Sequence, residues 1–213
     1  MDRPILYSFR RCPYAMRARL ALLVSRTACE LREVKLSDKP AEMIAASPKA
    51  TVPVIVQPDG EVIAESLDIM RRALGRNDPE GWLERDDASL IAANDGPFKH
   101  HLDRYKYPDR HDSDPIGHRG EGLRLLQVLE ARLASQAYLS GARRGLTDAA
   151  IFPFVRQFAQ VDRAWFDSQS LPRLRDWLER QLATPLFAAA MLRLPPWRPG
   201  DEPQVFFAEQ ANP

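Results

Sequence analysis

The chain reads Arg11-Cys12-Pro13-Tyr14-Ala15-Met16-Arg17 shortly after an apolar segment, Ile5-Leu6-Tyr7. The apolar segment predicts a buried strand over residues 5–9, and the spacing of apolar side chains after it predicts a helix over residues 13–25. Pro13 suits the first turn of that helix, where a missing N–H costs nothing. Cys12 is therefore expected at a helix N-terminus beside cationic side chains, a setting that favours the thiolate.

The stretch lacks the second cysteine of a redox dithiol. Ala15 stands where a Cys-x-x-Cys motif has its other thiol, so redox chemistry at Cys12 would need a sulfur from a small molecule. The alternative is that Cys12 is a small capping or buried residue, as structural cysteines commonly are. The other cysteine, Cys29, is expected to be a small buried residue and not a resolving thiol.

Strand and helix signals alternate in the first third of the chain and are helical afterwards. Strands are expected over residues 31–36 and 61–64, and residues 48–56 are expected to be a loop that leads into a further strand between them. Helices are expected over 66–74, 83–105, 117–136, 147–161, 171–182 and 185–192, and an irregular proline-rich tail from residue 195. The sequence thus predicts an α/β domain over residues 1–75, a linker over 76–82 and an all-helical domain with that tail over 83–213.

Composition excludes several classes of function. With 30 basic and 29 acidic residues the net charge is +1, so nucleic acid and anionic membranes are not expected partners. No apolar run reaches the length of a membrane span and no signal peptide is apparent. Two cysteines make no disulfide framework, which indicates a reducing cytoplasm. The four histidines lack a recognisable metal spacing, so no metal site is expected; they are His100, His101, His111 and His118.

Three motifs together indicate a family. They are Cys12-Pro13-Tyr14-Ala15 with Arg17-Ala18-Arg19-Leu20 behind it, Val52-Pro53, and Glu65-Ser66 at the start of a helix. In this order and at these separations they resemble the glutathione transferase superfamily, over nearly the whole chain. The resemblance implies a thioredoxin-like domain followed by a helical one. Cys-Pro-Tyr-Ala is most similar to the omega and omega-like members, which use a cysteine, and also to the large glutaredoxins, which carry Cys-Pro-Tyr-Cys.

The resemblance also implies a site for glutathione. Val52, before a cis Pro53, would hold the cysteinyl part through its backbone. Ser66 would receive the γ-glutamyl carboxylate at a helix N-terminus, and Glu65 the α-ammonium group. Lys49 or Lys39 would pair with the glycyl carboxylate, although Ala45 and Ala46 occupy the region where omega members carry a lysine. The alternatives are an ordinary trans proline and a plain helix cap at Ser66.

The helical domain is expected to contribute to the acceptor site. Gly96-Pro97 should kink the helix that faces the cleft in the resembled fold. Candidate acceptor-site residues are Arg11, Tyr14, Lys99, Arg104 and Tyr105. His100 and Tyr107 are further candidates for lining this site. The alternative for the helix is a solvated Lys/Arg/His face with tyrosines packed on a neighbouring helix.

The segment over residues 141–148 resembles the capping segment of the superfamily. Asp148 matches the family pattern, Gly145 replaces the usual hydroxyl cap, and Thr147 is available to cap one turn later. The segment is expected to be structural.

The function that this resemblance implies is glutathione-dependent thiol transfer through a mixed disulfide at Cys12, with a small-molecule or glutathionylated acceptor. A homodimer is expected from the resemblance alone. One alternative is conjugation of glutathione to electrophiles, activated by Tyr7 or Ser8. Another is a non-catalytic interaction protein, like the stringent starvation proteins, which resemble this fold.

Overall fold

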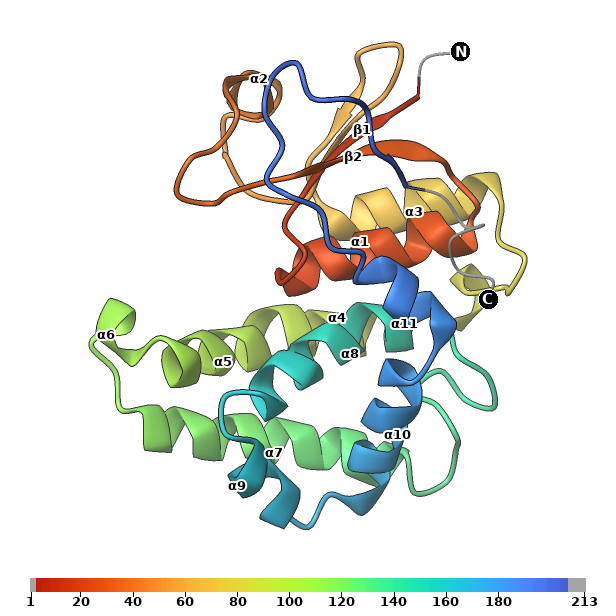
Figure 1. Ribbon diagram of the computed structural model, residues 1–213. Helices are drawn as coiled ribbons and strands as arrows, with labels where there is room; N and C mark the ends of the chain where they lie inside the picture. The colour runs from red at the N-terminus through yellow and green to blue at the C-terminus, as the bar shows by residue number, and fades with distance from the viewer. Residues whose placement is uncertain (1–2, 207–213) are drawn as a thin grey trace. The chain divides into compact units, whose positions relative to one another are not determined.

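The structure is a computed structural model, and it describes residues 3–206 (Figure 1). The described chain divides into two compact units. One unit contains the residues up to Glu80 together with those from Ala183 onward, and the other is Gly81–Leu182. The first is an α/β unit and the second is helical, as the sequence predicts.

A mixed sheet forms the centre of the α/β unit. Its strands are β1 (Ile5–Ser8), β2 (Cys29–Glu33), β3 (Val54–Val56), β4 (Val62–Ile63) and β5 (Val205–Phe206), in the order β4-β3-β1-β2-β5. β1 and β2 are parallel, and every other pairing is antiparallel. A parallel pair needs a crossover connection, and helix α1 (Pro13–Val24) provides it.

Two long helices cover this sheet. α1 is buried from Ala15 to Val24 and packs against α3 (Ser66–Arg76), which lies beside it in Figure 1. The sequence predicts no helix between residues 36 and 54, where the structure has the short helix α2 (Ala41–Ala46). Its one buried side chain, Met43, joins a small apolar cluster with Tyr7, Val34 and Val54.

The C-terminal segment differs from the expectation of an irregular tail on the helical domain. Helix α11 (Pro185–Ala190) packs against α1, and β5 pairs with β2, placing Phe206 opposite Cys29. The physical reason is that an edge strand needs a partner for its backbone groups. The Trp197 N–H also donates to the Glu33 carbonyl at 2.8 Å. These contacts group the segment with the α/β unit.

A buried ion pair joins the elements of this unit. Arg19 on α1 has no exposed surface, and its guanidinium pairs with the carboxylate of Glu33 on β2. The same guanidinium donates to the Ser8 hydroxyl at 2.8 Å and to the Ala190 carbonyl at 3.2 Å. The second carboxylate oxygen of Glu33 accepts the backbone N–H of Arg10 at 2.8 Å. Glu33 therefore also holds the loop that leads into Cys12.

The helical unit contains more elements than the sequence predicts. They are η1 (Leu83–Arg85), α4 (Ala88–Ala93), η2 (Asn94–Phe98), α5 (Lys99–Lys106), α6 (Pro108–His111), α7 (Pro115–Arg132), α8 (Leu146–Ala159), α9 (Arg163–Ser168) and α10 (Pro172–Leu182). The expected helix over residues 83–105 is thus several segments, with a π-helical turn around Pro97. A π-helical turn changes the backbone hydrogen-bond pattern locally, so the helix can continue past a proline, which has no N–H to donate. In residues 3–206, no helix has the length and apolar character that crossing a membrane requires.

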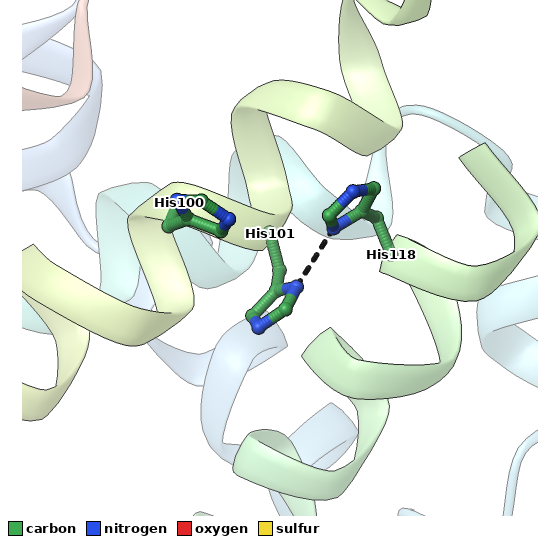
Figure 2. Close-up of side chains that lie close together, drawn as sticks. All are labelled: His100, His101 and His118. Carbon is green, nitrogen blue, oxygen red and sulfur yellow. Dashed lines mark hydrogen bonds between the residues drawn. The ribbon is translucent and has the colours of Figure 1, made fainter. Parts of the chain in front are cut away.

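α5 packs on α7 within this unit. The packing brings three histidine rings together, His100 and His101 from α5 and His118 from α7 (Figure 2). The spacing of these histidines in the sequence does not predict that their rings lie together.

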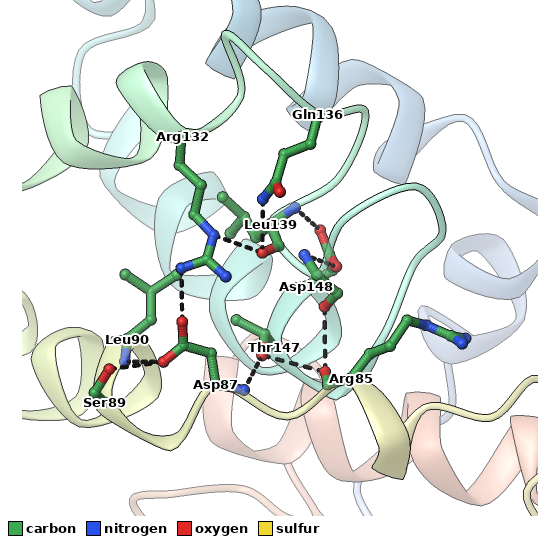
Figure 3. Close-up of polar contacts among 10 residues, drawn as sticks. Arg85, Asp87, Ser89, Leu90, Arg132, Gln136, Leu139, Thr147 and Asp148 are labelled. Carbon is green, nitrogen blue, oxygen red and sulfur yellow. Dashed lines mark hydrogen bonds and ion pairs between the residues drawn. The ribbon is translucent and has the colours of Figure 1, made fainter.

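Asp148 organises the start of α8 (Figure 3). Its buried carboxylate accepts the backbone N–H groups of Leu139, Ser140 and Gly145 at 2.8, 3.1 and 3.2 Å. The indole N–H of Trp177 donates to the same group at 2.8 Å. This confirms the structural role expected for Asp148, because four donors share one buried acceptor.

Gly145 and Thr147 have roles that the sequence did not show. A Cβ on Gly145 would lie 2.5 Å from the Arg85 Cβ and 2.7 Å from the Arg85 carbonyl oxygen, so a serine cap does not fit. Thr147 does not cap a later turn. Its hydroxyl accepts the Asp87 N–H at 2.7 Å and contacts the Arg85 carbonyl at 3.3 Å, and it thereby fastens α8 to the start of α4 (Figure 3).

Candidate functional site

Cys12 occupies the N-cap position of α1, with extended backbone angles (φ −77°, ψ 123°) and Pro13 as the next residue. Its N–H donates to the Phe9 carbonyl, and its carbonyl accepts the Met16 N–H, both at 2.9 Å. The side chain is half-buried, and its thiol donates to the Val52 carbonyl oxygen at 3.6 Å. The sulfur therefore lies at the N-terminus of a buried helix, where unpaired N–H groups and the helix dipole favour an anion.

The second motif lies immediately before β3. The Val52–Pro53 peptide bond is cis, which confirms what the family resemblance implies. Val52 is half-buried against the cluster around Tyr7 and Val54, while Pro53 is buried. The two motifs, far apart in the sequence, thus meet through the contact between Cys12 and Val52.

The third motif lies at the N-terminus of α3. Ser66 is its first residue and is buried, and its hydroxyl accepts the Nε–H of Arg17 at 3.0 Å. Arg17 is only 2% exposed, and its guanidinium lies 5.0 Å from the centre of the Tyr14 ring. The sequence analysis did not single out Arg17 as a site residue. A buried cation beside Ser66 adds charge at the position expected for a carboxylate.

Glu65 and Lys49 form an ion pair beside Ser66. The Lys49 ammonium donates to the Glu65 carboxylate at 2.6 Å, both side chains are largely exposed, and the pair raises the pKa of Lys49. Glu65 occupies the N-cap position of α3, where the family resemblance implies the γ-glutamyl group of glutathione. Lys49 therefore lies at this end of the expected glutathione site and not at a separate place for the glycyl carboxylate. Lys39 is half-buried and precedes Pro40 at the start of α2.

Comparison with known proteins decides the family. Residues 6–81 match the glutathione S-transferase N-terminal domain, and residues 80–180 match the corresponding C-terminal domain. The chain belongs to the glutathione transferase superfamily. Its sequence is 28% identical over 203 residues to a pyrimidodiazepine synthase of Drosophila melanogaster, covering 86% of this chain and 79% of that protein. It is 25% identical to the probable glutathione S-transferase MSR-1 of Nicotiana plumbaginifolia, covering 72% and 73%.

Solved structures agree on the fold. A glutathione transferase family member from Pseudomonas fluorescens, crystallised with two glutathione molecules, superimposes with a TM-score of 0.74 at 19% identity, covering 89% of this chain and 92% of that one. At this identity the similarity supports the fold of the superfamily. The α/β unit described above is accordingly the thioredoxin-like part of a glutathione transferase fold.

Among the acceptor-site candidates of this transferase, two flank Cys12. Arg11 is exposed, with its guanidinium 5.2 Å from the Phe9 ring, and Tyr14 is half-buried beneath Arg17. Both belong to the α/β unit and lie within two residues of the sulfur in the sequence.

The candidates on α5 engage side chains of their own unit. Lys99 pairs with Asp103, and Arg104 donates to the His100 ring at 3.0 Å. Tyr105 is 6% exposed and packs on Phe158 with ring centres 5.1 Å apart; burial raises its pKa. The Tyr107 ring lies 4.5 Å from the guanidinium of Arg110. These contacts favour the alternative, a polar face with packed tyrosines, for this helix.

The rival activating groups of the transferase are buried. Tyr7 is 2% exposed, its hydroxyl accepts from Arg32 at 2.9 Å, and burial raises its pKa despite that positive charge. Ser8 has no exposed surface, and its hydroxyl accepts from Arg19. Neither is placed to activate a bound thiol.

Cys29 lies in β2 and is fully buried. Burial raises the pKa of its thiol to about 12, so it stays protonated and unreactive at neutral pH. The expectation that Cys29 is a buried residue is confirmed.

Proposed function

We propose that this transferase is an omega-like, glutathione-dependent thiol transferase that forms a mixed disulfide with glutathione at Cys12. The observation that carries the proposal is the contact between the Cys12 sulfur and the Val52 carbonyl, beside Pro53. In the resembled fold the residue before that proline binds the cysteinyl backbone of glutathione, so the two sulfurs would be neighbours.

The reaction takes two thiol–disulfide exchanges. In the first, the Cys12 thiolate attacks the glutathionyl sulfur of a disulfide between glutathione and an acceptor. A bond forms between Cys12 and glutathione, and the acceptor leaves as a thiolate that takes up a proton. In the second, the thiolate of another glutathione attacks the glutathionyl sulfur, giving glutathione disulfide and restoring the Cys12 thiolate. Overall, the acceptor sulfur is released as a thiol, and the one incoming glutathione is oxidised as it becomes half of glutathione disulfide.

The side chains around the site support this cycle. Ala15 and the buried Cys29 provide no second protein thiol that could intercept the mixed disulfide. Ser66 with Arg17, and Glu65 beside them, provide a positive and a negative group for the carboxylate and ammonium of a γ-glutamyl moiety. The proposed cycle needs reduced glutathione, so it fits a reducing compartment such as the cytoplasm.

Two other functions are less well supported. Conjugation activated by Tyr7 or Ser8 conflicts with the burial of both hydroxyl groups. A non-catalytic interaction protein would have no need for the group of glutathione-binding features around Cys12. The observations favour the thiol transferase over both.

One experiment separates the three functions. The protein is incubated with glutathione disulfide, and the intact mass is measured for the wild type and for Cys12→Ser. We expect a single glutathionyl adduct on the wild type and none on the variant. An adduct that persists in Cys12→Ser overturns the proposal. Absence of any adduct, with no glutathione binding by calorimetry, favours the interaction protein.

We also propose that the transferase is a homodimer, as the family resemblance implies. The support within this chain is an apolar groove between α4 and α7, bordered by Leu90, Leu125 and Val128, with Val128 56% exposed. Exposed apolar patches of this kind mark association surfaces. Light scattering coupled to gel filtration is expected to give twice the chain mass for the wild type and the chain mass for Val128→Glu. A monomeric wild type contradicts this proposal and leaves the chemistry at Cys12 untouched.

A further inference from the structure

Three imidazole rings converge on one point of the helical unit, although no metal site was expected from the sequence. His100 and His101 are consecutive on α5, and His118 lies on the facing helix α7 (Figure 2). One ligand atom from each histidine lies within 4.8 Å of the others. The ring centres are 5.1 Å apart for His100 and His101, 5.1 Å for His101 and His118, and 5.8 Å for His100 and His118.

The closest contact joins two ring nitrogens. The Nδ1 atoms of His101 and His118 lie 2.8 Å apart in a hydrogen bond. A neutral imidazole has one N–H and one lone pair, so one of these atoms holds the proton and the other accepts it. Both Nδ1 lone pairs become available to a metal ion when the ring that holds this proton carries it on its Nε2 atom instead. With zinc–nitrogen bonds of about 2.0–2.1 Å, tetrahedral binding separates the two nitrogens by about 3.4 Å, which requires only a small movement of the rings.

His100 is suited to be the third ligand, but the guanidinium of Arg104 competes with a metal ion for its ring nitrogen. It is exposed, and its Nδ1 accepts from Arg104 at 3.0 Å. A guanidinium cannot accept a hydrogen bond, so Arg104 must be the donor in this pair. Arg104 therefore occupies a lone pair of His100 and places a positive charge near the cluster. Arg104 must move aside for His100 to bind a cation through Nδ1.

The protonation of the cluster agrees with metal binding. Desolvation, followed by the charge of Arg104, lowers the pKa of His100, and desolvation followed by its histidine neighbours lowers the pKa of His101. The other charged or titratable groups near the rings are Asp103, His111 and Glu121. Both shifts favour neutral imidazole, the form that binds metals, but the proposal rests on the geometry of the three rings.

We propose that His100, His101 and His118 bind a divalent ion of the late first-row transition metals, Zn²⁺ or a neighbour such as Ni²⁺ or Cu²⁺. Imidazole ligands suit these ions, and three protein ligands leave one position for water. Because α5 and α7 both provide ligands, the ion joins two helices of one unit. The site is independent of the thiol chemistry proposed for Cys12.

The test uses the full-length chain without a histidine tag, in buffer free of glutathione and chelators. Zn²⁺ is titrated by calorimetry, and Co²⁺ is added as a spectroscopic probe of the ligand geometry. We expect one ion per chain and a higher melting temperature with Zn²⁺, since an ion that binds only the folded state stabilises it. His101→Gln and His118→Gln should each weaken Zn²⁺ binding at least about tenfold, because even the loss of an outer hydrogen-bond partner has an effect of that size.

Three further variants make the result specific. His111→Gln removes the fourth histidine and should retain wild-type affinity. Cys12→Ser should also retain it, which excludes the thiol as the ligand. Arg104→Gln should tighten binding, because it removes the competing cation. Unchanged Zn²⁺ affinity in His101→Gln and His118→Gln, or its loss in Cys12→Ser, overturns the proposal. If His118→Gln does not fold, His101→Gln and His100→Gln test the proposal in its place, and both should weaken Zn²⁺ binding. His100 is exposed.

Discussion

The sulfur of Cys12 lies 3.6 Å from the carbonyl oxygen of Val52, which is 40 residues further along the chain. The contact joins the N-terminus of α1 to the residue that precedes β3. The proposed nucleophile and the proposed contact for the cysteinyl backbone of glutathione are therefore adjacent. An attack from Cys12 on a disulfide bound at Val52 needs no long movement of either segment.

Introducing a second thiol at position 15 should change the product that glutathione disulfide forms at Cys12. Residues three apart in a helix lie on the same face, so Ala15→Cys places a thiol next to the glutathionyl adduct. We expect this variant, after treatment with glutathione disulfide, to form an intramolecular disulfide with a mass two hydrogens below the reduced chain. The wild type should retain the glutathionyl adduct. Intact mass spectrometry distinguishes the two products.

Two controls belong with this variant. Ala15→Ser has a similar size and no thiol, and it should retain the adduct, which shows that packing at this buried position is tolerated. Cys29→Ser should also retain it, because the buried Cys29 thiol, with a pKa of about 12, takes no part. An Ala15→Cys variant that keeps its glutathionyl adduct would count against the geometry proposed for Cys12.

The sequence was informative where the chemistry depends on neighbouring residues. The strand before Cys12, Pro13 at the first helical turn and the apolar spacing behind it all report local preferences, and the structure has these elements within a residue or two. The sequence could not show contacts that depend on packing between distant segments. Glu33 meeting Arg19, β5 pairing with β2, and His118 meeting His101 all result from tertiary packing, which no local pattern encodes.

Gly145 shows the same limit at a single residue. In the sequence it looks like a tolerated replacement for a hydroxyl cap. In the structure it is required, because a side chain would collide with Arg85, about 60 residues earlier. Lys49 is a second case, since its pairing with Glu65 depends on tertiary packing that brings the loop before Val52 next to the start of α3.

The ion pair between Lys49 and Glu65 predicts how glutathione affinity responds to substitution. If the α-ammonium of glutathione replaces Lys49 as the partner of Glu65, removing Lys49 costs little binding. We therefore expect Lys49→Ala to keep the wild-type dissociation constant within a few-fold, while Glu65→Gln weakens binding by about tenfold, the loss of one charge-assisted hydrogen bond. Calorimetry with glutathione in a Cys12→Ser background measures both.

The opposite ranking has a clear meaning. If Lys49→Ala weakens binding as much as Glu65→Gln, Lys49 holds the glycyl carboxylate of the ligand, as the family resemblance implies. Lys35→Ala serves as the matched control and should leave binding unchanged, since it removes an exposed lysine of the α/β unit that pairs with Asp38 and has no proposed role in the site.

The buried pair of Arg19 and Glu33 should be important for stability. Glu33→Gln preserves the shape of the side chain and leaves the Arg19 guanidinium without its negative partner in a fully buried position. Removing one partner of a buried pair costs about 3–5 kcal/mol. We expect a loss of that size in the free energy of unfolding by urea.

An exposed pair in the same unit provides the comparison. Glu61 pairs with Arg72, and both side chains are nearly half exposed. Glu61→Gln should therefore change stability by no more than about 1 kcal/mol. Equal effects of the two substitutions would show that burial of Arg19 does not govern the strength of its pairing.

The carboxylate of Asp87 should make stability depend on pH in acid. It accepts from the Ser89 hydroxyl at 2.7 Å, from the Leu90 N–H at 3.0 Å and from Arg132 at 2.6 Å, and these donors lower its pKa to about 2 (Figure 3). An unfolded aspartate has a pKa of about 3.9. The stabilisation is therefore complete above pH 4 and is lost as the pH falls from about 4 to about 2.

Two substitutions separate the cap from the charge. Asn caps a helix about as well as Asp, so Asp87→Asn should cost only the pair with Arg132, about 1 kcal/mol or less at pH 7. Asp87→Ala also loses the cap and should cost about 1 kcal/mol more. Unfolding followed by circular dichroism between pH 7 and pH 2 should show the gap between wild type and Asp87→Asn closing in the acid range. A gap that stays constant down to pH 2 would mean that the charge on Asp87 contributes nothing to folding.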